Sequence, residues 1–535
     1  MKTISKYVSV LLVTALSFAS CNEWMNAGPE GATKTADQVE EAAQLNPNTA
    51  AADLSAIYAQ FIQLYGGLGD LGYSRHNDYG YAAVCLFMDE QGQDLVSPNT
   101  GYNWFQFADF PSNRDNTLTT TRGLVNQLVW GTYYKIIFAC NNVIGMVDRE
   151  DPGSQKYALS QALAVRSMCY MNLAQLFQFT YLTTDKKATT VPLVLDRMPA
   201  EKITNNPRAT LEELFARCTE DLDYACKNLD GYSRPDKGFV DQAVAFGLRA
   251  RLNLLKGEWA KAAEDADQAL KLSGATPLSI EEANEPGFAD GSAHNVLWAN
   301  IIVETNDVVQ TGIVNWPSHM SIFFRDGYTS VAATRSIASA LYYDIPATDV
   351  RKGWWLNEQL ESPLLDAAGY NAVKATIQGS EDNVFTNVKF GTGDRSSTGD
   401  GAAAADWIIM RAEEMYLIKA EGLARAGQDG AAVLTDFVKK FRDPSFNPAQ
   451  HGLSIEDEIW WQRRVELWGE GFAWFDIMRL EKPIVRSTSS NYPAAWGNMD
   501  VPARHGVLLW RIPQSEIESN DGISEADNNP FVSFP

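Results

Sequence analysis

Few residues of this chain stand in patterns that carry out catalysis. The five histidines form neither an H-x-H nor an H-E-x-x-H pattern, so the sequence predicts no histidine-based metal site. A nucleophile elbow (G-x-S-x-G) and a Walker A motif are absent as well. A G-x-G-x-x-G motif occurs at Gly67, Gly69 and Gly72, but it follows an expected helix instead of the strand that a dinucleotide-binding site needs. We therefore expect a flexible turn there and no catalytic residue.

Three acidic residues, Asp89, Glu90 and Asp94, cluster in the segment FMDEQGQD. Glycosidases act with pairs of carboxylates, but spacing in a sequence does not give the carboxyl separation that such catalysis needs. A solvated or calcium-binding acidic loop is the favoured interpretation, because calcium takes several oxygen ligands from loops of this kind. No EF-hand pattern supports a calcium ion, so a structural cation stays a hypothesis and no other cofactor is expected.

Aromatic residues interleaved with amides and charges in long loops are the better functional signal. A sugar ring has one apolar C–H face, on which a flat side chain stacks, and a rim of hydroxyls that Asn, Asp, Arg and Gln bind. For any single ring, burial in the core is the alternative. The candidate ligand-binding residues are Trp104, Tyr102, Asn103, Trp316, Asn315, Arg325, Tyr328, Tyr73 and Tyr81.

Two of these aromatic residues are the strongest candidates for stacking on a ligand, and another pair of tryptophans forms a further candidate cluster. Trp104 is the first choice because its loop, SPNTGYNW, has no helical period that would bury it. Trp316 is the second, since Pro317 is expected to stiffen the turn that presents its ring. Trp354 and Trp355 form a third aromatic cluster.

The composition is that of a folded globular protein. Of 535 residues, 45% are hydrophobic and 21% charged, and the length allows about three or four domains or one large fused architecture. The net charge of −23 would repel phosphate backbones, so general nucleic-acid binding is improbable.

The N-terminus has the pattern of a lipoprotein signal. Lys2 and Lys6 precede an apolar stretch over 8–18, and small residues then lead to Cys21. We expect cleavage after residue 20, acylation of Cys21 as a membrane anchor, and a flexible tether over 21–50. An ordinary secretory signal with a chance cysteine is the alternative. The remaining chain has no apolar run of 18 residues.

Helical periodicity dominates the rest of the chain, with long loops between the helices. The five later cysteines contain no C-x-x-C pair and are expected to be buried small hydrophobes. The stretches 66–123, 274–335 and 353–406 are longer than ordinary loops, so they must contain short strands or loops that have a function. The expected helices span 53–65, 124–147, 155–179, 210–229, 241–271, 408–426, 430–442 and 454–467.

Part of this helical pattern repeats with the offsets of the 34-residue tetratricopeptide unit. Small alanines would let two antiparallel helices approach, and a glycine would turn the chain between them. One copy has Ala250, Gly257, Trp259, Ala262 and Ala269; a second has Ala420, Gly427 and Ala432; the segment 162–177 fits the first half of a third. Generic alanine-rich helices are the alternative, but stacked copies are favoured because one pair cannot bury its own face.

Five segments together resemble the SusD/RagB family of bacterial outer-membrane nutrient-uptake lipoproteins. They stand in the family's order behind the lipoprotein signal. The matching residues are Arg166, Tyr170 and 191–193; Asp349 and Arg351; Arg411, Glu413, Glu414 and Glu421; Arg463, Glu466, Glu470, Gly471, Trp474, Phe475, Asp476 and Arg479; and Trp510, Ile512, Pro513, Gln514, Glu516 and Asn520. Departures from the family pattern at Gln462, Ala473 and Arg511 put particular salt bridges in doubt.

The resemblance implies a mainly α fold, in which tetratricopeptide-like helix pairs carry long loops and small β-elements. It divides the chain into an N-terminal SusD-like region over 51–273, with the insertion 66–123, and a C-terminal region over 274–535, with the loop 274–406 and helices over 408–467. It also implies a non-enzymatic lipoprotein on the outer-membrane surface that binds oligosaccharides for a SusC-like TonB-dependent transporter. A peptide or another nutrient as ligand is the first alternative, and a surface glycoside hydrolase the second.

Overall fold

The structure is a computed structural model of the full chain. It describes residues 49–64, 76–102, 104–105, 108, 123–367, 369–495 and 499–532. Cys21, the signal and most of the tether, the glycine motif at 67–72, Tyr73 and Asn103 lie outside these residues. None of the described helices is both long and apolar enough to cross a membrane.

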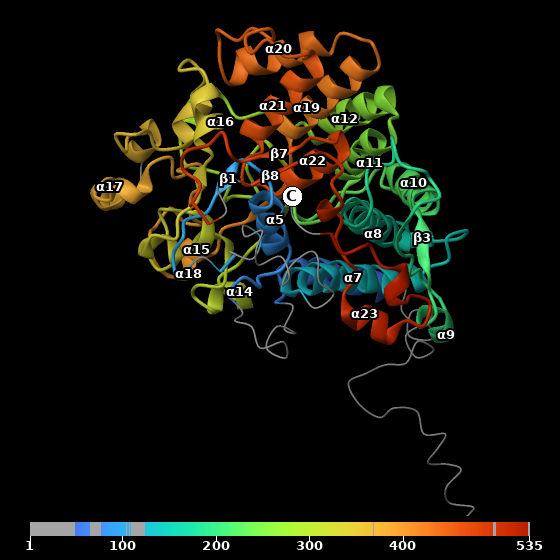
Figure 1. Ribbon diagram of the computed structural model, residues 1–535. Helices are drawn as coiled ribbons and strands as arrows, with labels where there is room; N and C mark the ends of the chain where they lie inside the picture. The colour runs from blue at the N-terminus through green and yellow to red at the C-terminus, as the bar shows by residue number, and fades with distance from the viewer. Residues whose placement is uncertain are drawn as a thin grey trace, which may run out of the picture.

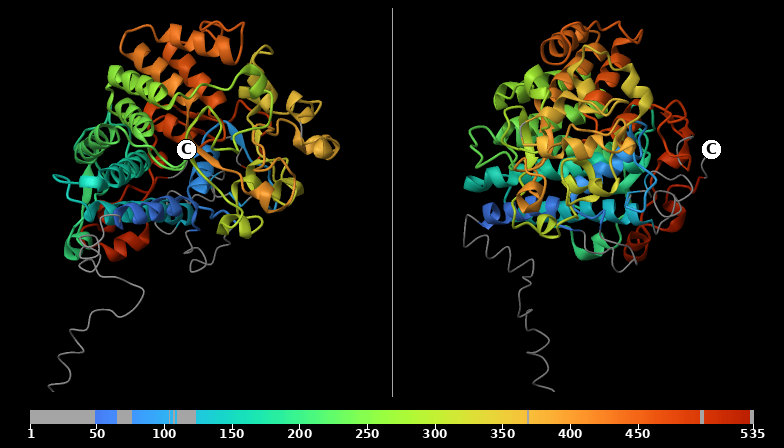
Figure 2. Two further views of the ribbon diagram at one scale, coloured as in Figure 1. Left: turned by 180° about the vertical axis from the view of Figure 1, so that it is seen from behind. Right: turned by 90° about the vertical axis from the view of Figure 1, so that its left-hand side faces the viewer.

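A curved array of packed helices forms the scaffold of the molecule (Figures 1 and 2). Each helix contacts the next in the array, and α19 contacts both α20 and α21. The array therefore continues from the N-terminal half into the C-terminal half, with α12 packed against α19. Its members are α4 (Thr49–Ile62), α7 (Leu124–Gly145), α8 (Lys156–Phe177), α10 (Leu211–Asn228), α11 (Gln242–Lys256), α12 (Trp259–Ser273), α19 (Ala412–Arg425), α20 (Gly430–Phe441) and α21 (Ile455–Glu466).

The tetratricopeptide-like repeat is confirmed, except that Ala432, one of its expected contact positions, is exposed on α20. Helix α11 ends at Gly257, whose φ of 75° is the left-handed conformation that glycine adopts without a Cβ penalty. The predicted helix over 241–271 is thus two antiparallel helices. Ala250 and Ala262 are buried, and a Cβ at Gly422 would lie 2.6 Å from the backbone oxygen of Trp259, so only glycine allows α19 to approach α12 this closely.

A second part of the molecule, built from loops, short helices and two-stranded ribbons, packs against this array. The described ribbons are all antiparallel: β1 (Leu95–Val96) with β5 (Ser336–Ile337), β2 (Thr189–Pro192) with β3 (Arg208–Thr210), β4 (Val296–Asn300) with β6 (Trp407–Arg411), and β7 (Ile484–Val485) with β8 (Asp500–Val501). The prediction of a mainly α fold with small β-elements is confirmed. One boundary is wrong, because 408–411 belongs to strand β6 and the helix begins only at Ala412.

Short helices fill the long loop stretches. The α-helical ones are α5 (Tyr81–Glu90), α9 (Ala200–Ile203), α13 (Ile280–Ala283), α14 (Asp307–Gln310), α15 (Trp316–Met320), α16 (Ser339–Asp344), α17 (Asn371–Gln378), α18 (Gly399–Ala403), α22 (Ala473–Leu480) and α23 (Gln514–Ser519). The 3-10 turns are η3 (Gly153–Gln155), η4 (Tyr328–Val331), η5 (Val350–Trp354), η6 (Pro363–Asp366), η7 (Glu381–Asn383), η8 (Gly506–Leu508) and η9 (Glu525–Asp527).

The acidic segment, which begins in the last turn of α5 and continues to Asp94, is buried, so its interpretation as a solvated or calcium-binding loop is wrong. Asp89 accepts hydrogen bonds from the backbone N–H groups of Gly471 (2.7 Å) and Ala473 (3.0 Å). Glu90 pairs with Arg335 at 2.6 Å, and Asp94 with Arg464 at 2.5 Å. Among the described residues, no group of three or more acidic, histidine or cysteine side chains could hold a metal ion. These carboxylates instead fasten α5 to the C-terminal half.

The five cysteines after Cys21 behave as predicted. All are buried and none forms a disulfide. Burial raises the pKa of each thiol, that of Cys226 to about 12, because the thiolate would lose its hydration in the core.

Candidate ligand-binding surface

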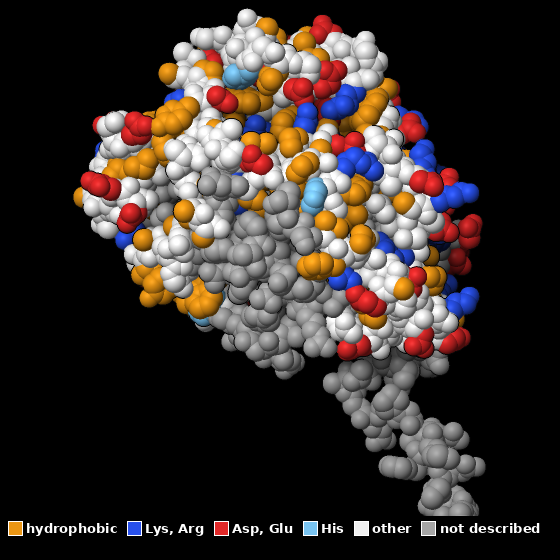
Figure 3. All heavy atoms as spheres, in the orientation of Figure 1, with side chains coloured by type: hydrophobic (Ala, Val, Ile, Leu, Met, Phe, Trp, Pro, Cys, Tyr) orange, Lys and Arg blue, Asp and Glu red, His pale blue; other side chains and the backbone are white. Residues whose placement is uncertain are grey.

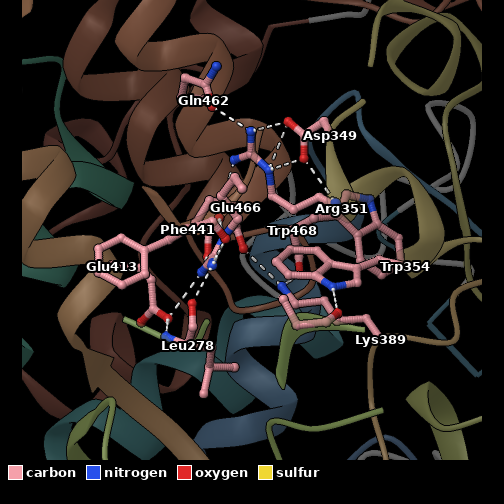
Figure 4. Close-up of polar contacts among 12 residues, drawn as sticks. Leu278, Asp349, Arg351, Trp354, Lys389, Glu413, Phe441, Gln462, Glu466 and Trp468 are labelled. Carbon is pink, nitrogen blue, oxygen red and sulfur yellow. Dashed lines mark hydrogen bonds and ion pairs between the residues drawn. The ribbon is translucent and has the colours of Figure 1, made fainter. Parts of the chain in front are cut away.

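Most charged residues that carry the family resemblance in the C-terminal half are buried rather than displayed. Eight of the buried charges form one network, which we call the charge network, and none of its side chains is more than 6% exposed. It joins η5, β6, α19, α21 and the loops between them (Figure 4). Its four cations are Arg351, Lys389, Arg411 and Arg442, and its four carboxylates are Asp349, Glu413, Glu466 and Glu470.

Glu466 is the centre of the charge network. Its Oε1 accepts from Arg411 and Arg442, both at 2.8 Å, and its Oε2 accepts from Arg442 at 2.8 Å and Arg351 at 3.2 Å. Burial alone would raise the pKa of Glu466, but Arg442 and Arg411 hold it well below its ordinary range. Burial lowers the pKa of Lys389 to about 8, although Glu470 opposes this shift. Glu466 is therefore a fully engaged anion, and we assign it to the scaffold.

The departure at Gln462 does not break the network. Gln462 accepts a hydrogen bond from Arg351 through its Oε1 (2.6 Å) and donates one to Glu458 through its Nε2 (2.9 Å). The amide therefore supplies the acceptor that Arg351 needs without adding a charge (Figure 4).

Six aromatic side chains from the loops form a second grouping, which we call the aromatic cluster. One layer of the cluster, called the upper layer, contains His76, Trp104 and Tyr328. In it the His76 ring stacks on Trp104, with 4.3 Å between the ring centroids and 11° between the ring planes. Tyr328 meets both rings edge-on, at 5.7 Å and 6.4 Å, and its hydroxyl contacts Nδ1 of His76. Its lower layer is His319, Tyr79 and Phe105.

Hydrogen bonds to backbone carbonyl oxygens hold the cluster in place, and two of the rings in or beside it are partly or half exposed. His319 Nε2 lies 2.9 Å from the His76 carbonyl oxygen, and Asn77 donates to the Trp104 carbonyl oxygen at 3.1 Å. Trp104 is only partly buried, and Tyr102 beside it is 49% exposed. Since His76 covers one face of the Trp104 ring, a ligand can stack only on the other.

Two polar atoms of the lower layer are unused. Among the described residues, the Tyr79 hydroxyl and Nδ1 of His319 are buried without a hydrogen-bond partner. Burial lowers the pKa of His319 well below its ordinary value, so its imidazole is neutral at physiological pH. Burial raises the pKa of Tyr328, because it disfavours the charged phenolate in the same way. The cluster thus combines stacking surface with two polar atoms whose hydrogen-bonding capacity is unused.

The structure brings some of the candidate residues together and separates others. Trp104, Tyr102 and Tyr328 lie in or beside the aromatic cluster, and the partly exposed Arg325 precedes Tyr328 on the same turn. His76 was not among the candidate residues. Its position in the aromatic loop sequence SRHNDY is the signal that could have indicated its role.

The expectation that Trp316 presents its ring to solvent is wrong. Trp316 is 5% exposed and packs on Trp407 at 4.1 Å and on Phe390 at 5.5 Å. The reason is local: Asn315 caps α15 by accepting from the backbone N–H of Ser318 (3.0 Å), and Pro317 stands in the first turn. Asn315 is therefore occupied as well. Tyr81, Trp354 and Trp355 are also buried, within the core.

Comparisons with known proteins agree with the sequence resemblance. A model of the SusD family matches residues 362–531, and a model described as "Starch-binding associating with outer membrane" (SusD-like) matches residues 81–254. The chain belongs to the SusD/RagB family. The SusD-like protein P38 of Formosa agariphila is 23% identical over 423 residues, covering 72% of this chain and 80% of P38.

Solved structures show the same SusD fold. A SusD-like carbohydrate-binding protein of Bacteroides vulgatus matches with a TM-score of 0.68 at 21% identity, covering 90% of this chain and 98% of its own. A SusD superfamily protein of Bacteroides thetaiotaomicron matches at 0.66 and 22%, covering 90% and 99%. The surface glycan-binding protein A of Bacteroides fluxus matches at 0.61 and 15%, covering 91% and 100%. At these identities the likeness establishes the fold alone.

Proposed function

We propose that this chain binds oligosaccharides at the aromatic cluster and delivers them to a SusC-like TonB-dependent transporter. The observation that carries the proposal is the Trp104 ring, which is only partly buried, stacks on His76 and lies beside the exposed Tyr102. Membership of the SusD/RagB family supports it, as does the structural likeness to a surface glycan-binding protein.

Capture would need no chemistry. In this proposal, the face of Trp104 opposite His76 stacks on the apolar face of one sugar, and Tyr102 contacts the next sugar of the oligosaccharide. Arg325 and Asn103 bind sugar hydroxyls. Because the bound sugar is not altered, modest affinity allows release to the transporter. A protein with this role needs no catalytic residue and no cofactor.

The binding test compares Trp104→Ala with wild type in affinity gels that contain candidate glycans. Losing one stacking platform should weaken binding by about 1–3 kcal/mol, which is roughly five- to 150-fold. Tyr343→Ala is the control, because Tyr343 is an exposed aromatic residue (56%) that lies in α16, outside the cluster. Unchanged retention of Trp104→Ala on a glycan that wild type binds would refute this platform. Binding of wild type to peptides only would refute the sugar assignment.

The backing role of His76 has its own test. His76→Phe keeps a flat ring beneath Trp104, whereas His76→Leu removes the stack at similar volume. We expect His76→Phe to retain glycan better than His76→Leu, with both chains equally stable. Equal retention by the two variants would remove His76 from the site.

We also propose that the chain is anchored at Cys21 and faces the outside of the outer membrane. Metabolic labelling with a fatty acid should tag the wild-type protein. Cys21→Ala should abolish the label and release the protein from the membrane fraction, whereas label that persists in this variant would refute the anchor.

A further inference from the structure

A small cavity of about 20 Å³ lies where the helix array meets the loop part of the molecule, and it shares Tyr79 with the aromatic cluster. Its walls come from the end of α4, the start of α5, α14, α15 and the β4–β6 ribbon. The volume is close to what one water molecule needs and is far too small for a sugar. Among the described residues, no charged side chain lines the cavity, and the Asn315 amide is already occupied in the cap of α15.

Three hydrogen-bond donors on the residues that line this cavity have no partner within the described part of the chain. They are the Tyr79 hydroxyl, Nδ2 of Asn300 and Nε1 of Trp407. None of these residues is more than 6% exposed. The Cys85 thiol is near the Trp407 indole, but sulfur is a weak acceptor and does not satisfy this N–H. Because a buried donor without an acceptor costs stability, we expect an accepting group at this place.

The fold holds these side chains in fixed positions. Asn300 and Trp407 stand directly opposite each other in the β4–β6 ribbon, so their side chains point to the same face. Tyr79 precedes Gly80, at which a Cβ would lie 2.2 Å from the Phe61 carbonyl oxygen. The backbone at the start of α5 is therefore packed closely against α4, and the donors are positioned before anything binds between them.

The types of donor indicate what the cavity binds. Amide and indole N–H groups only donate, so the bound molecule must accept hydrogen bonds from Asn300 and Trp407, whereas the Tyr79 hydroxyl can also accept one. A water oxygen accepts two hydrogen bonds, and a water hydrogen can be donated to the hydroxyl. A chloride ion would accept as well, but it would be buried without a positive side chain on the lining, which is costly.

We infer that the cavity binds one ordered water, which joins Tyr79 of the aromatic cluster to Asn300 and Trp407 of the β4–β6 ribbon. Buried waters typically make about three hydrogen bonds and are costly to remove. The water fixes the hydroxyl end of a ring that stacks on His319. Asn300 and Trp407 thereby act as positioning residues for the glycan platform without touching the glycan. This last step rests on the proposed function, whereas the water itself does not.

A crystal structure of the full chain with Cys21→Ser, which cannot be acylated, tests the water directly. We expect a density peak within hydrogen-bond distance of the Tyr79 hydroxyl and of Nδ2 of Asn300. The peak should show no anomalous signal after the crystal is soaked in bromide. An empty cavity, a direct hydrogen bond between Tyr79 and Asn300, or bromide in the cavity would overturn the inference.

A double-mutant cycle tests the same bridge in solution. Tyr79→Phe and Asn300→Leu each remove one partner with little change in volume, and each should raise the unfolding constant about two- to tenfold in denaturant titrations. Because one water serves both partners, the double variant should be affected at least about threefold less than the product of the single effects. Should Asn300→Leu not fold, the crystal structure decides alone.

Tyr170→Phe provides the matched control for this cycle. Tyr170 is also buried, but its hydroxyl donates to the Val194 carbonyl oxygen at 2.8 Å, and it does not line the cavity. Its effect should therefore multiply with that of Asn300→Leu. Effects of Tyr79→Phe and Asn300→Leu that also simply multiply would contradict a shared water.

Glycan retention on affinity gels tests the positioning role. On a glycan that wild type binds, Asn300→Leu should weaken retention about twofold or more, while Tyr170→Phe leaves it unchanged. Unchanged retention in Asn300→Leu would remove Asn300 from the support of the glycan platform. If wild type retains no glycan, the proposed function fails, and the crystal structure and the cycle still decide whether the water is bound.

Discussion

The charge network and the aromatic cluster differ in how fully their hydrogen-bonding capacity is used. In the charge network, both oxygens of Glu466 are engaged and no side chain is more than 6% exposed. The aromatic cluster leaves the Tyr79 hydroxyl and Nδ1 of His319 without partners among the described residues, and Tyr102 beside it is half exposed. Charged motif residues therefore mark the scaffold here, while largely uncharged loop side chains mark the surface available to a ligand.

Breaking the charge network should have the largest effect on stability. Arg411→Met would leave Glu466 and Glu470 buried without their shared cation, and we expect a loss of about 3–5 kcal/mol in the free energy of unfolding, measured by denaturant titration. Arg395→Met is the control, because Arg395 and Glu285 form an exposed pair worth at most about 1 kcal/mol. A loss below that of the control would mean that the network is not needed for stability.

Replacing two tryptophans, one in the core and one in the aromatic cluster, tests the difference in burial between these two regions. Trp316→Ala opens a cavity beside Trp407 and should cost about 3–5 kcal/mol of stability. Trp104→Ala removes a partly exposed ring and should cost less than about 2 kcal/mol. The thermal midpoints of both variants check this order, and a larger loss in Trp104→Ala would place Trp104 in the core.

Overpacking the helix array should have a moderate effect. Ala250 is fully buried in α11, so Ala250→Phe should cost about 1–3 kcal/mol in thermal or chemical unfolding while glycan retention stays unchanged. Ala432→Phe is the control, because Ala432 is exposed on α20 and should change stability by no more than about 0.5 kcal/mol. Equal losses in the two variants would contradict the repeat register.

The last expected effect is a pH dependence of stability at α5. Burial raises the pKa of Asp89 from 3.8 to about 7, so the folded chain holds a proton that the unfolded chain releases. The contribution of Asp89 to stability is therefore present at low pH and is lost as the pH rises to about 7. Unfolding free energies at pH 5 and pH 8 should differ more in wild type than in Asp89→Asn, and equal differences would refute this assignment.

The helix array was largely predictable because its residues repeat with a period near 3.6 and its turns contain glycine. The repeat offsets also located the turn between α11 and α12 at Gly257, although helical periodicity alone runs through it. The burial of Glu466 and Arg411 was not predictable in the same way. A charged residue in a helix normally lies at the surface, and only partners far away in the chain reveal that it does not.

The candidate site was predictable in part. The loop that holds Trp104 was identified by its composition, which has no period that would bury the ring. Trp316 was misjudged because Asn-Trp-Pro-Ser was taken for a rigid turn. An asparagine cap followed by a proline in the first turn indicates the start of a helix, and this helix directs the ring inward. His76 has no partner visible in the sequence, because its contacts with Tyr328 and His319 span about 250 residues.

Helix α5 is fastened mainly to segments made much later during synthesis. Asp94 pairs with a residue 370 positions further on, and Asp89 with backbone groups 382 and 384 positions away. Charged side chains along the edge formed by α10 and β3 lie instead on the surface, where they meet solvent (Figure 3). Closing loops of such length is costly and slow. The carboxylates of α5 therefore remain without these partners until nearly the whole polypeptide is complete, and a chain truncated before α21 cannot form the centre of the molecule.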